Sequence, residues 1–169
     1  LLEEVRDREE YIDYLNKEIS KYISKIMVKE RNPKDSQYMS ALFKVCGNLE
    51  RIGDHAVNIC EYTKMIEEKN ITFSKEVIGE IAQMREICVK ALSKVESIDN
   101  GINVAEIASI EEKIDEMTEQ FRKNQIDRMQ VGKCSDEGCV LYSEMLTDFE
   151  RIGDHILNVG QEMAGAVNE

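Results

Sequence analysis

The chain has 169 residues, of which 42% are hydrophobic, enough for one folded domain with a substantial apolar core. It carries 22 Lys and Arg residues against 34 Asp and Glu residues, a formal net charge of −12. This charge disfavours direct binding to nucleic acid or to an anionic membrane surface, and favours cations or a basic protein surface as partners. No stretch approaches the ~20 consecutive apolar residues that cross a bilayer, so we expect no membrane insertion of this segment.

The cysteines are odd in number and scattered along the chain, which indicates no disulfide framework. A reducing, cytoplasmic environment is the simplest interpretation. Cys134 and Cys139 have no second Cys or His pair beside them, so a structural zinc site is disfavoured.

Pro33 separates the first two expected helices. Apolar residues repeat every seven positions over residues 5–26, the pattern of a helix with one buried stripe. The stripe stops near residues 29–33, because a proline disfavours helical backbone at the residue before it. We expect Asp35 or Ser36 to cap the second helix, which has an apolar stripe over residues 42–59 and ends near Glu68.

Three more helices are expected after residue 70. Ser74 is the expected cap of the third, which has its apolar face over residues 78–95 and is followed by a turn at 99–101. The fourth covers residues 104–129. A loop at 132–138 precedes the fifth, which runs through residues 141–159 and is expected to fray at 164–166. Since no segment alternates like a strand, we predict an all-α fold, an antiparallel helix bundle.

A duplicated motif is the most informative feature of the sequence. Leu-Glu-Arg-Ile-Gly-Asp-His at 49–55 returns as Phe-Glu-Arg-Ile-Gly-Asp-His at 149–155, an offset of 100 residues. Glu-Glu-Tyr-Ile-Asp at 9–13 returns as Glu-Glu-Lys-Ile-Asp at 111–115, an offset of 102 residues. Two ordered matches at nearly one offset indicate two repeats, 1–70 and 71–169, within one compact domain. The third helix has no counterpart in the first repeat, so we expect that a leading helix is missing.

Each motif contains a Glu and an Asp four residues apart, which a helix presents on one side. If the first two helices pack antiparallel, four carboxylates meet at one seam, where they cannot all stay ionised without a cation. Oxygen ligands suit hard ions such as Mg²⁺, Ca²⁺, Mn²⁺ or ferric iron. The predicted metal ligands are Glu9, Asp13, Glu50 and Asp54, with the same spacing repeated at Glu111, Asp115, Glu150 and Asp154.

Residues beside the carboxylates have predicted supporting roles. A glycine inside a helix costs about 1 kcal/mol relative to alanine, so Gly53 and Gly153 are expected to let a neighbouring helix approach closely. Arg51 and Arg151 are expected to form local ion pairs. The residues predicted to lie next to the metal ligands, rather than to bind the metal directly, are Asn58, Asn158, Asp148, His55 and His155.

The segment Leu-Glu-Arg-Ile-Gly-Asp-His-Ala-Val-Asn-Ile at 49–59 resembles the signature of PhoU proteins, and its second copy resembles the two-repeat plan of that family. The resemblance implies tandem three-helix bundles that bind metal clusters through paired carboxylates. It places Glu9 and Asp13 with Glu50 and Asp54, and it places Glu111 and Asp115 with Glu150 and Asp154. The family's acidic position before the motif is matched by Asp148 but is Asn48 in the first copy, so the two sites are not expected to be equivalent.

The chain is most similar to the PhoU-like domain at the C-terminus of bacterial sodium/phosphate cotransporter family proteins, through its loop at 132–138 and the missing leading helix. This implies a regulatory domain that binds iron, manganese, zinc, magnesium or calcium. It also implies a membrane transporter domain upstream in the same chain and a place on the cytoplasmic side of the inner membrane. A homodimer is left open. The alternative is a free-standing PhoU regulator of a phosphate ABC transporter.

Two other functions were weighed against this one. A di-iron carboxylate oxidase normally places a His three residues after a Glu, whereas His55 follows Glu50 by five, so we do not expect an enzyme. A helical adaptor without metal is the other alternative.

Overall fold

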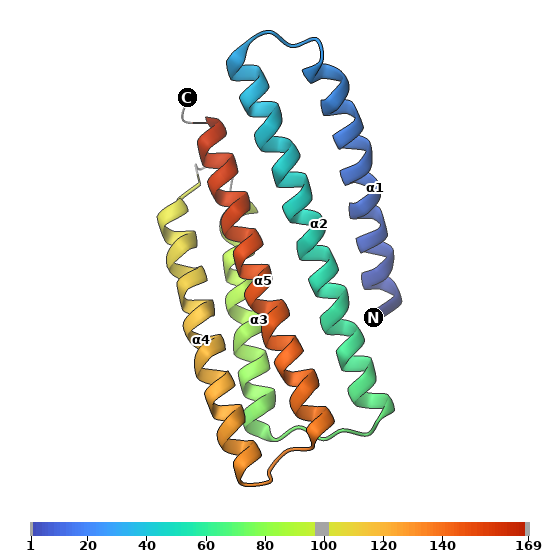
Figure 1. Ribbon diagram of the computed structural model, residues 1–169, viewed down its shortest axis with the longest axis vertical. Helices are drawn as coiled ribbons and strands as arrows, with labels where there is room; N and C mark the ends of the chain where they lie inside the picture. Colours follow the sequence, from blue (N-terminus) through green and yellow to red (C-terminus); the bar gives the residue numbers. More distant parts are fainter. Residues whose placement is uncertain (1, 97–101, 168–169) are drawn as a thin grey trace.

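Figure 1 shows the computed structural model of the chain, in which residues 2–96 and 102–167 are described. The helices are α1 (Leu2–Met27), α2 (Pro33–Glu68), α3 (Lys75–Glu96), α4 (Val104–Gln130) and α5 (Asp136–Val167). No strand occurs within the described ranges, and the predicted all-α class is confirmed. The turn predicted at 99–101 lies outside the described residues.

Helix α5 is the centre of the bundle and packs on α2, α3 and α4. Helix α1 packs on α2, on the far side from α5, and α3 also packs on α4 (Figure 1). The molecule therefore consists of a two-helix unit, α1–α2, and a three-helix unit, α3–α4–α5, joined along the antiparallel pair α2 and α5. The predicted repeat boundary at residue 70 falls in the connection between these units.

Helix α2 begins at Pro33, three residues earlier than a cap at Asp35 allows and four earlier than a cap at Ser36 allows. Its N-cap is Asn32, which accepts a hydrogen bond from the Lys34 backbone N–H at 3.1 Å, and Pro33 occupies the first helical turn. Proline fits there because the missing N–H would have no partner within the helix. The prediction of Asp35 or Ser36 as the cap was therefore wrong. The predicted cap of α3 is confirmed, because Ser74 Oγ accepts a hydrogen bond from the Val77 N–H at 3.4 Å.

Helix α5 begins at Asp136, inside the predicted loop, and continues to Val167 through the predicted frayed end. Two acidic residues in its first turn favour the earlier start, since they interact with the positive end of the helix dipole. Cys134, in the preceding loop, forms a disulfide with Cys139 in α5. The prediction that no disulfide pattern is present was wrong, because the turn from α4 to α5 brings together two cysteines that lack any repeated spacing.

The apolar core lies mainly within the three-helix unit. Its fully buried side chains include Met84 of α3, Ile114 of α4, and Leu146 and Ile156 of α5. Helix α1, by contrast, buries only Ile23, because α1 packs against a single neighbour. The two repeats thus differ in how completely their helices are covered.

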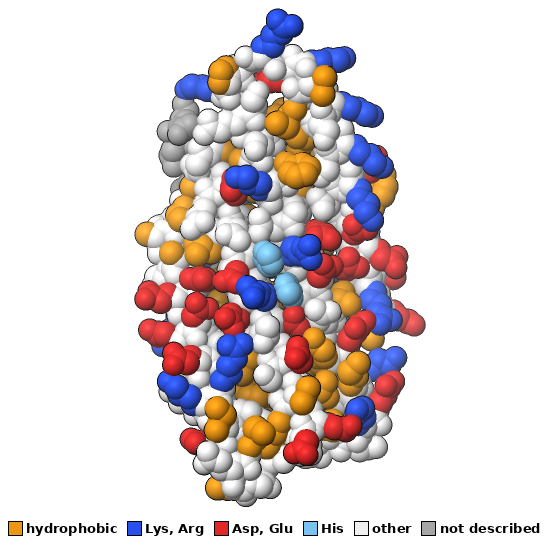
Figure 2. Space-filling model, in the orientation of Figure 1, with side chains coloured by type: hydrophobic (Ala, Val, Ile, Leu, Met, Phe, Trp, Pro, Cys, Tyr) orange, Lys and Arg blue, Asp and Glu red, His pale blue; other side chains and the backbone are white. Residues whose placement is uncertain are grey.

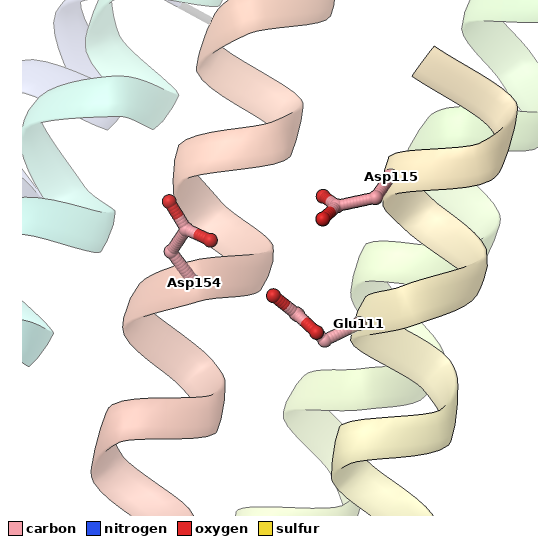
Figure 3. Close-up of side chains that lie close together, drawn as sticks. All are labelled: Glu111, Asp115 and Asp154. Atoms are coloured by element: carbon pink, nitrogen blue, oxygen red, sulfur yellow. The ribbon is translucent and has the colours of Figure 1, made fainter. Parts of the chain in front are cut away.

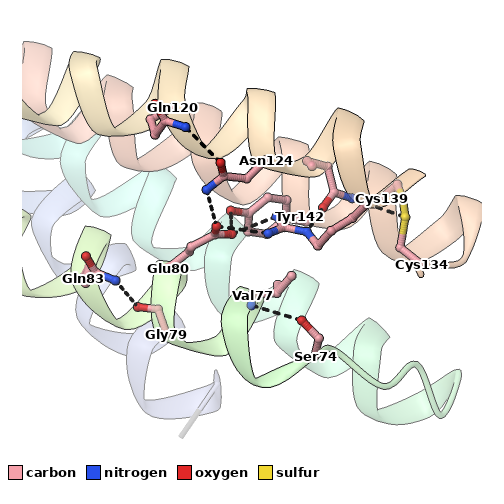
Figure 4. A network of polar contacts seen from close by, with 12 residues as sticks. Ser74, Val77, Gly79, Glu80, Gln83, Gln120, Asn124, Cys134, Cys139 and Tyr142 are labelled. Atoms are coloured by element: carbon pink, nitrogen blue, oxygen red, sulfur yellow. Dashed lines mark hydrogen bonds and ion pairs between the residues drawn. A yellow bond between two sulfur atoms is a disulfide. The ribbon is translucent and has the colours of Figure 1, made fainter. Parts of the chain in front are cut away.

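One buried acid joins the three helices of the second unit (Figure 4). Glu80 of α3 receives hydrogen bonds from Arg128 of α4 at 3.0 and 2.8 Å, from Asn124 at 2.7 Å, and from the Tyr142 hydroxyl of α5. Burial alone would raise the pKa of Glu80, but the hydrogen bonds from Arg128, Tyr142 and Asn124 outweigh it and lower that pKa. The ionised carboxylate therefore fixes α3 against both neighbours.

Replacing Arg128 with Met should lower the free energy of unfolding by about 3 kcal/mol, because Glu80 is left buried without its cation. Adding Glu80→Leu to this variant should restore more than half of the loss, since an apolar pair of similar volume needs no compensating charge. Urea unfolding followed by circular dichroism measures both changes. A double variant as unstable as Arg128→Met alone would contradict this role of the ion pair.

Candidate metal centre

The second repeat brings three of its four predicted ligands together (Figure 3). Glu111 and Asp115 lie one turn apart on α4, and Asp154 faces them from α5. One carboxylate oxygen from each residue lies within 4.8 Å of the others. The antiparallel packing of α4 and α5 thus creates a cluster of oxygen donors from two helices.

The charges in this cluster work against one another. Burial raises the pKa of Glu111, and the neighbouring Asp115 and Asp154 raise it further. The pKa of Asp115 is also raised, first by burial and then by Glu150 and Asp154. Several carboxylates this close favour either protonation or a bound cation. The donor set is entirely oxygen, so it fits hard ions such as Mg²⁺, Mn²⁺, Ca²⁺ or ferric iron.

Glu150, the fourth predicted ligand in this repeat, is engaged elsewhere. Its carboxylate forms an ion pair with Arg122 of α4 at 2.9 Å, and Arg122 also donates to Thr147 Oγ1 at 3.1 Å. Glu150 lies one helical turn before Asp154, next to the cluster. It would need to exchange Arg122 for a metal ion in order to bind one.

The predicted ligands of the first repeat lie near one another but make a looser set: Glu9, Asp13, Glu50 and Asp54. Burial raises the pKa of Glu9, and the negative charges of Asp54 and Asp13 raise it further. Within the described residues, no three of these four acids have carboxylate oxygens that all lie within 4.8 Å of one another, unlike the acids of the second repeat. Lys17 forms an ion pair with Asp13 at 2.5 Å, however, and Arg51 lies 3.9 Å from Glu50 and 3.8 Å from Asp54. Basic side chains therefore contact three of these four acids, against two of the four in the second repeat, where Arg151 contacts Asp154 of the cluster.

The two arginines of the motifs form local ion pairs with the aspartates three residues later. Arg151 lies 3.2 Å from Asp154, closer than Arg51 lies to Asp54. These contacts agree with the predicted role of both arginines. Both arginines are exposed, so either ion pair can open at little cost.

The glycines of the two motifs face different surroundings. A Cβ atom at Gly153 would lie 3.0 Å from Ile114 Cδ1 and 3.4 Å from Ile114 Cγ2, so a side chain there would require Ile114 to shift. A Cβ atom at Gly53 would lie 3.6 Å from Glu9 Cγ and 3.7 Å from Ile12 Cδ1, which is ordinary contact. The expected close approach of a neighbouring helix is therefore found at Gly153 and not at Gly53.

The two histidines meet where α2 crosses α5. Their rings stack with centroids 5.6 Å apart. His55 Nδ1 hydrogen-bonds to Asp148 Oδ1 at 2.6 Å, and His155 Nδ1 hydrogen-bonds to Asn48 Oδ1 at 2.9 Å. Each partner is on the opposite helix and lies seven residues before that helix's own histidine. The crossing thus has approximate two-fold symmetry, with a carboxylate on one side and an amide on the other.

The asparagines of the motifs complete this crossing. Asn58 Nδ2 donates to Asp148 Oδ1, and Asn158 Nδ2 donates to Asn48 Oδ1, both at 3.4 Å. The five residues predicted to surround the metal therefore make their side-chain hydrogen bonds between α2 and α5. Figure 2 shows the two histidine rings near the middle of one face, with acidic side chains on both sides. Sequence reasoning missed Asn48 as a contact residue, although its place seven residues before His55 was a usable signal.

Replacing Gly53 with Ala should raise the free energy of unfolding by up to about 1 kcal/mol, since alanine favours helix and its Cβ fits. Gly153→Ala should lower the free energy of unfolding, because the new Cβ would press on Ile114, which is fully buried. Urea unfolding of both variants measures the difference. Equal effects in the two repeats would refute the difference in packing.

The crossing predicts a second difference between matched positions. Asp148→Ala should lower the free energy of unfolding by about 2 kcal/mol, because a buried hydrogen bond to a charged group is lost. Asn48→Ala removes the neutral, less buried counterpart and should cost about 1 kcal/mol. Thermal and urea unfolding of the two variants test this order, and a larger loss for Asn48→Ala would contradict it.

Comparison with known proteins finds relatives of this chain by sequence. PhoU homolog 1 of Thermotoga maritima is a phosphate-specific transport system accessory protein. It is 29% identical to this chain over an alignment of 170 positions, which covers 96% of this chain and 71% of that protein. The PhoU homolog of Streptococcus pneumoniae serotype 4, also named as such an accessory protein, is 21% identical over 129 residues. Those residues cover 76% of this chain and 60% of that protein.

The fold has a counterpart of known structure. The crystal structure of the phosphate transport system regulatory protein PhoU from Streptococcus pneumoniae matches with a TM-score of 0.82 at 19% identity, over 99% of this chain and 79% of that one. This likeness shows a shared helical fold. The PhoU domain family itself matches residues 1–63 and 78–163, which include both motifs and all eight predicted ligands. This chain therefore belongs to the PhoU domain family.

Proposed function

We propose that the chain is a regulatory module of phosphate transport that binds metal ions at two carboxylate clusters. The convergence of Glu111, Asp115 and Asp154 from two helices is the observation that carries the metal site. Membership of the PhoU family and the names of the relatives support the regulatory role.

Two kinds of phosphate transporter are candidates for regulation by this module. The relatives named above are accessory proteins of the phosphate-specific transport system, which favours a PhoU-type regulator of a phosphate ABC transporter over a domain of a sodium/phosphate cotransporter. None of the described helices is long and apolar enough to span a membrane. From the names of these relatives, we propose a membrane-embedded transporter component as the partner, contacted from the cytoplasmic side of the inner membrane.

The residues of the second repeat fit a hard metal ion better than those of the first. Glu111, Asp115 and Asp154 would hold it once Arg151 releases Asp154, and Glu150 would join if Arg122 moved away. The bound cation would neutralise the cluster and hold α4 against α5. In the first repeat, Glu9, Asp13, Glu50 and Asp54 would bind a second ion after Lys17 and Arg51 release their acids.

A regulator is favoured over a di-metal oxidase by the positions of the histidines. Both rings are hydrogen-bonded across the α2–α5 crossing, to Asp148 and to Asn48. Neither histidine belongs to the group of three donors that could hold a metal ion within the described residues, which consists of Glu111, Asp115 and Asp154. The remaining donors are carboxylates, which supply charge neutralisation and a structural link between helices.

Protein purified without chelator and loaded with Mn²⁺ should bind metal in both repeats, more tightly in the second. Glu111→Gln with Asp154→Asn should remove the metal of the second repeat alone, and Glu9→Gln with Asp54→Asn that of the first alone. Elemental analysis and isothermal titration calorimetry measure stoichiometry and affinity. Affinity should fall as the pH falls, because the raised pKa values of Glu111 and Asp115 let protons compete with the ion.

The matched control is Glu116→Gln with Glu119→Gln, which removes two charges from exposed positions on α4 and should leave binding unchanged. No metal after loading with manganese, iron, zinc, magnesium or calcium would refute the metal sites and leave an adaptor without metal. In cells lacking their own copy of the gene, the wild-type gene should restore regulated phosphate uptake, and the metal-site variants should not. Normal regulation of phosphate uptake by the metal-site variants would show that the regulatory role does not depend on metal binding.

A further inference from the structure

The two ends of the α2–α5 crossing carry different charges at positions that the duplication relates. At the offset of 100 residues, the matched positions are Lys44 and Glu144, Asn48 and Asp148, and Tyr62 and Glu162. Because α2 and α5 are antiparallel (Figure 1), Lys44 and Asn48 of α2 lie at the same end as Glu162 of α5. By the same relation, Glu144 and Asp148 of α5 lie at the end that holds Tyr62 of α2.

The first of these ends contains its own cation. Lys44 Nζ lies 2.9 Å from a carboxylate oxygen of Glu162, so one positive and one negative side chain balance each other. Asn48, one turn after Lys44, is neutral and hydrogen-bonds to His155. This end of the crossing therefore carries no uncompensated charge on the side chains that face each other.

The other end holds two acids that form no ion pair with any lysine or arginine that the structure describes. Asp148 is only 6% exposed. His55 and Asn58 both contact its Oδ1 atom, whereas Oδ2 is buried and has no hydrogen-bond partner in the described parts of the chain. Glu144 lies one turn before Asp148 on the same side of α5. A buried carboxylate oxygen without a partner indicates a bound species at this position.

The hydroxyl of Tyr62 faces this pair of acids from α2. Asn58 contacts Asp148 across the two helices, Tyr62 follows Asn58 by one turn, and Glu144 precedes Asp148 by one turn. Antiparallel packing therefore sets Tyr62 opposite Glu144. The residues at the two matched positions form the 2.9 Å ion pair of the first end, which shows that side chains at these positions reach each other.

The charges at this end act on Tyr62. Burial, followed by the negative charges of Asp148 and Glu144, raises the pKa of Tyr62 to about 12, so its hydroxyl stays protonated at neutral pH. Glu61, the next acid on α2, is held by Arg6 at 2.6 Å. The donors left at this end are therefore two carboxylates and one neutral hydroxyl.

We propose that Glu144, Asp148 and Tyr62 bind a hard divalent cation between α2 and α5. Such ions prefer oxygen ligands and accept water in the remaining positions. Two positive charges would balance the two acids, as Lys44 balances Glu162 at the other end. This ion joins the two repeats, whereas each candidate metal centre lies within one repeat. The inference depends on the crossing and is independent of those centres and of phosphate transport.

Calcium binding measured by isothermal titration calorimetry tests the site in a full-length chain whose other candidate ligands are replaced. The background variant carries Glu9→Gln, Asp54→Asn, Glu111→Gln and Asp154→Asn, and it should bind one Ca²⁺ ion. Adding Glu144→Gln should weaken this binding about tenfold or more, because one of two charged ligands is lost.

The matched control is Glu86→Gln, which removes an exposed acid of α3 and should leave Ca²⁺ binding to the background variant unchanged. A background variant that binds no Ca²⁺ would overturn the proposal. Binding that Glu144→Gln leaves unchanged would overturn it as well. Loss of the metal from Glu111, Asp115 and Asp154 with Ca²⁺ binding retained at the crossing would separate the two kinds of site.

Glu144→Lys tests the same site in an otherwise unaltered chain without added metal. This substitution places a lysine at the position matched to Lys44, one turn from Asp148. In EDTA it should raise the Tm by about 2–4 °C above that of Glu144→Gln, because the new charge takes the place of the cation. Glu86→Lys makes the same change of charge on α3 and should not raise the Tm. A Tm of Glu144→Lys no higher than that of Glu144→Gln would contradict the need for a cation here.

Discussion

The antiparallel contact of α2 with α5 sets the positions of the other features of this molecule. Stacked rings of His55 and His155 mark the crossing, and each ring is hydrogen-bonded to a side chain of the opposite helix. A hydrogen bond between partly buried groups has a direction, so the crossing fixes the register of the two helices as well as their proximity. Each repeat then adds its remaining helices to one side of this pair.

The carboxylates follow from that register. Asp54 and Asp154 lie one residue before the histidines, so each points roughly 100° around its helix from the crossing and toward the outer neighbour, α1 or α4. There they meet the Glu-x-x-x-Asp pairs of the neighbouring helices. The motif thus serves two purposes: its histidine joins the repeats, and in the second repeat its aspartate, Asp154, enters the candidate metal centre.

Duplication of the sequence has not produced equivalent repeats. In the second repeat the acids lie within 4.8 Å of one another, and Ile114 packs tightly against Gly153. In the first, Gly53 has room to spare and Lys17 and Arg51 engage the acids. The repeats also differ in their cover, because α3 packs on both α4 and α5 of the second repeat. Helices α1 and α2 have no such cover within the described residues.

The sequence by itself determined the all-α class, the duplication and the three acids that the structure brings together, Glu111, Asp115 and Asp154. These depend on local periodicity and on short spacings along one helix, which a linear reading captures. Only the tertiary structure decided that the histidines and asparagines join α2 to α5, that Glu150 is paired with Arg122, and that Cys134 is bonded to Cys139. It alone showed the buried Glu80 network. Those contacts depend on the rotation and register of helices far apart in the chain, which no local pattern encodes.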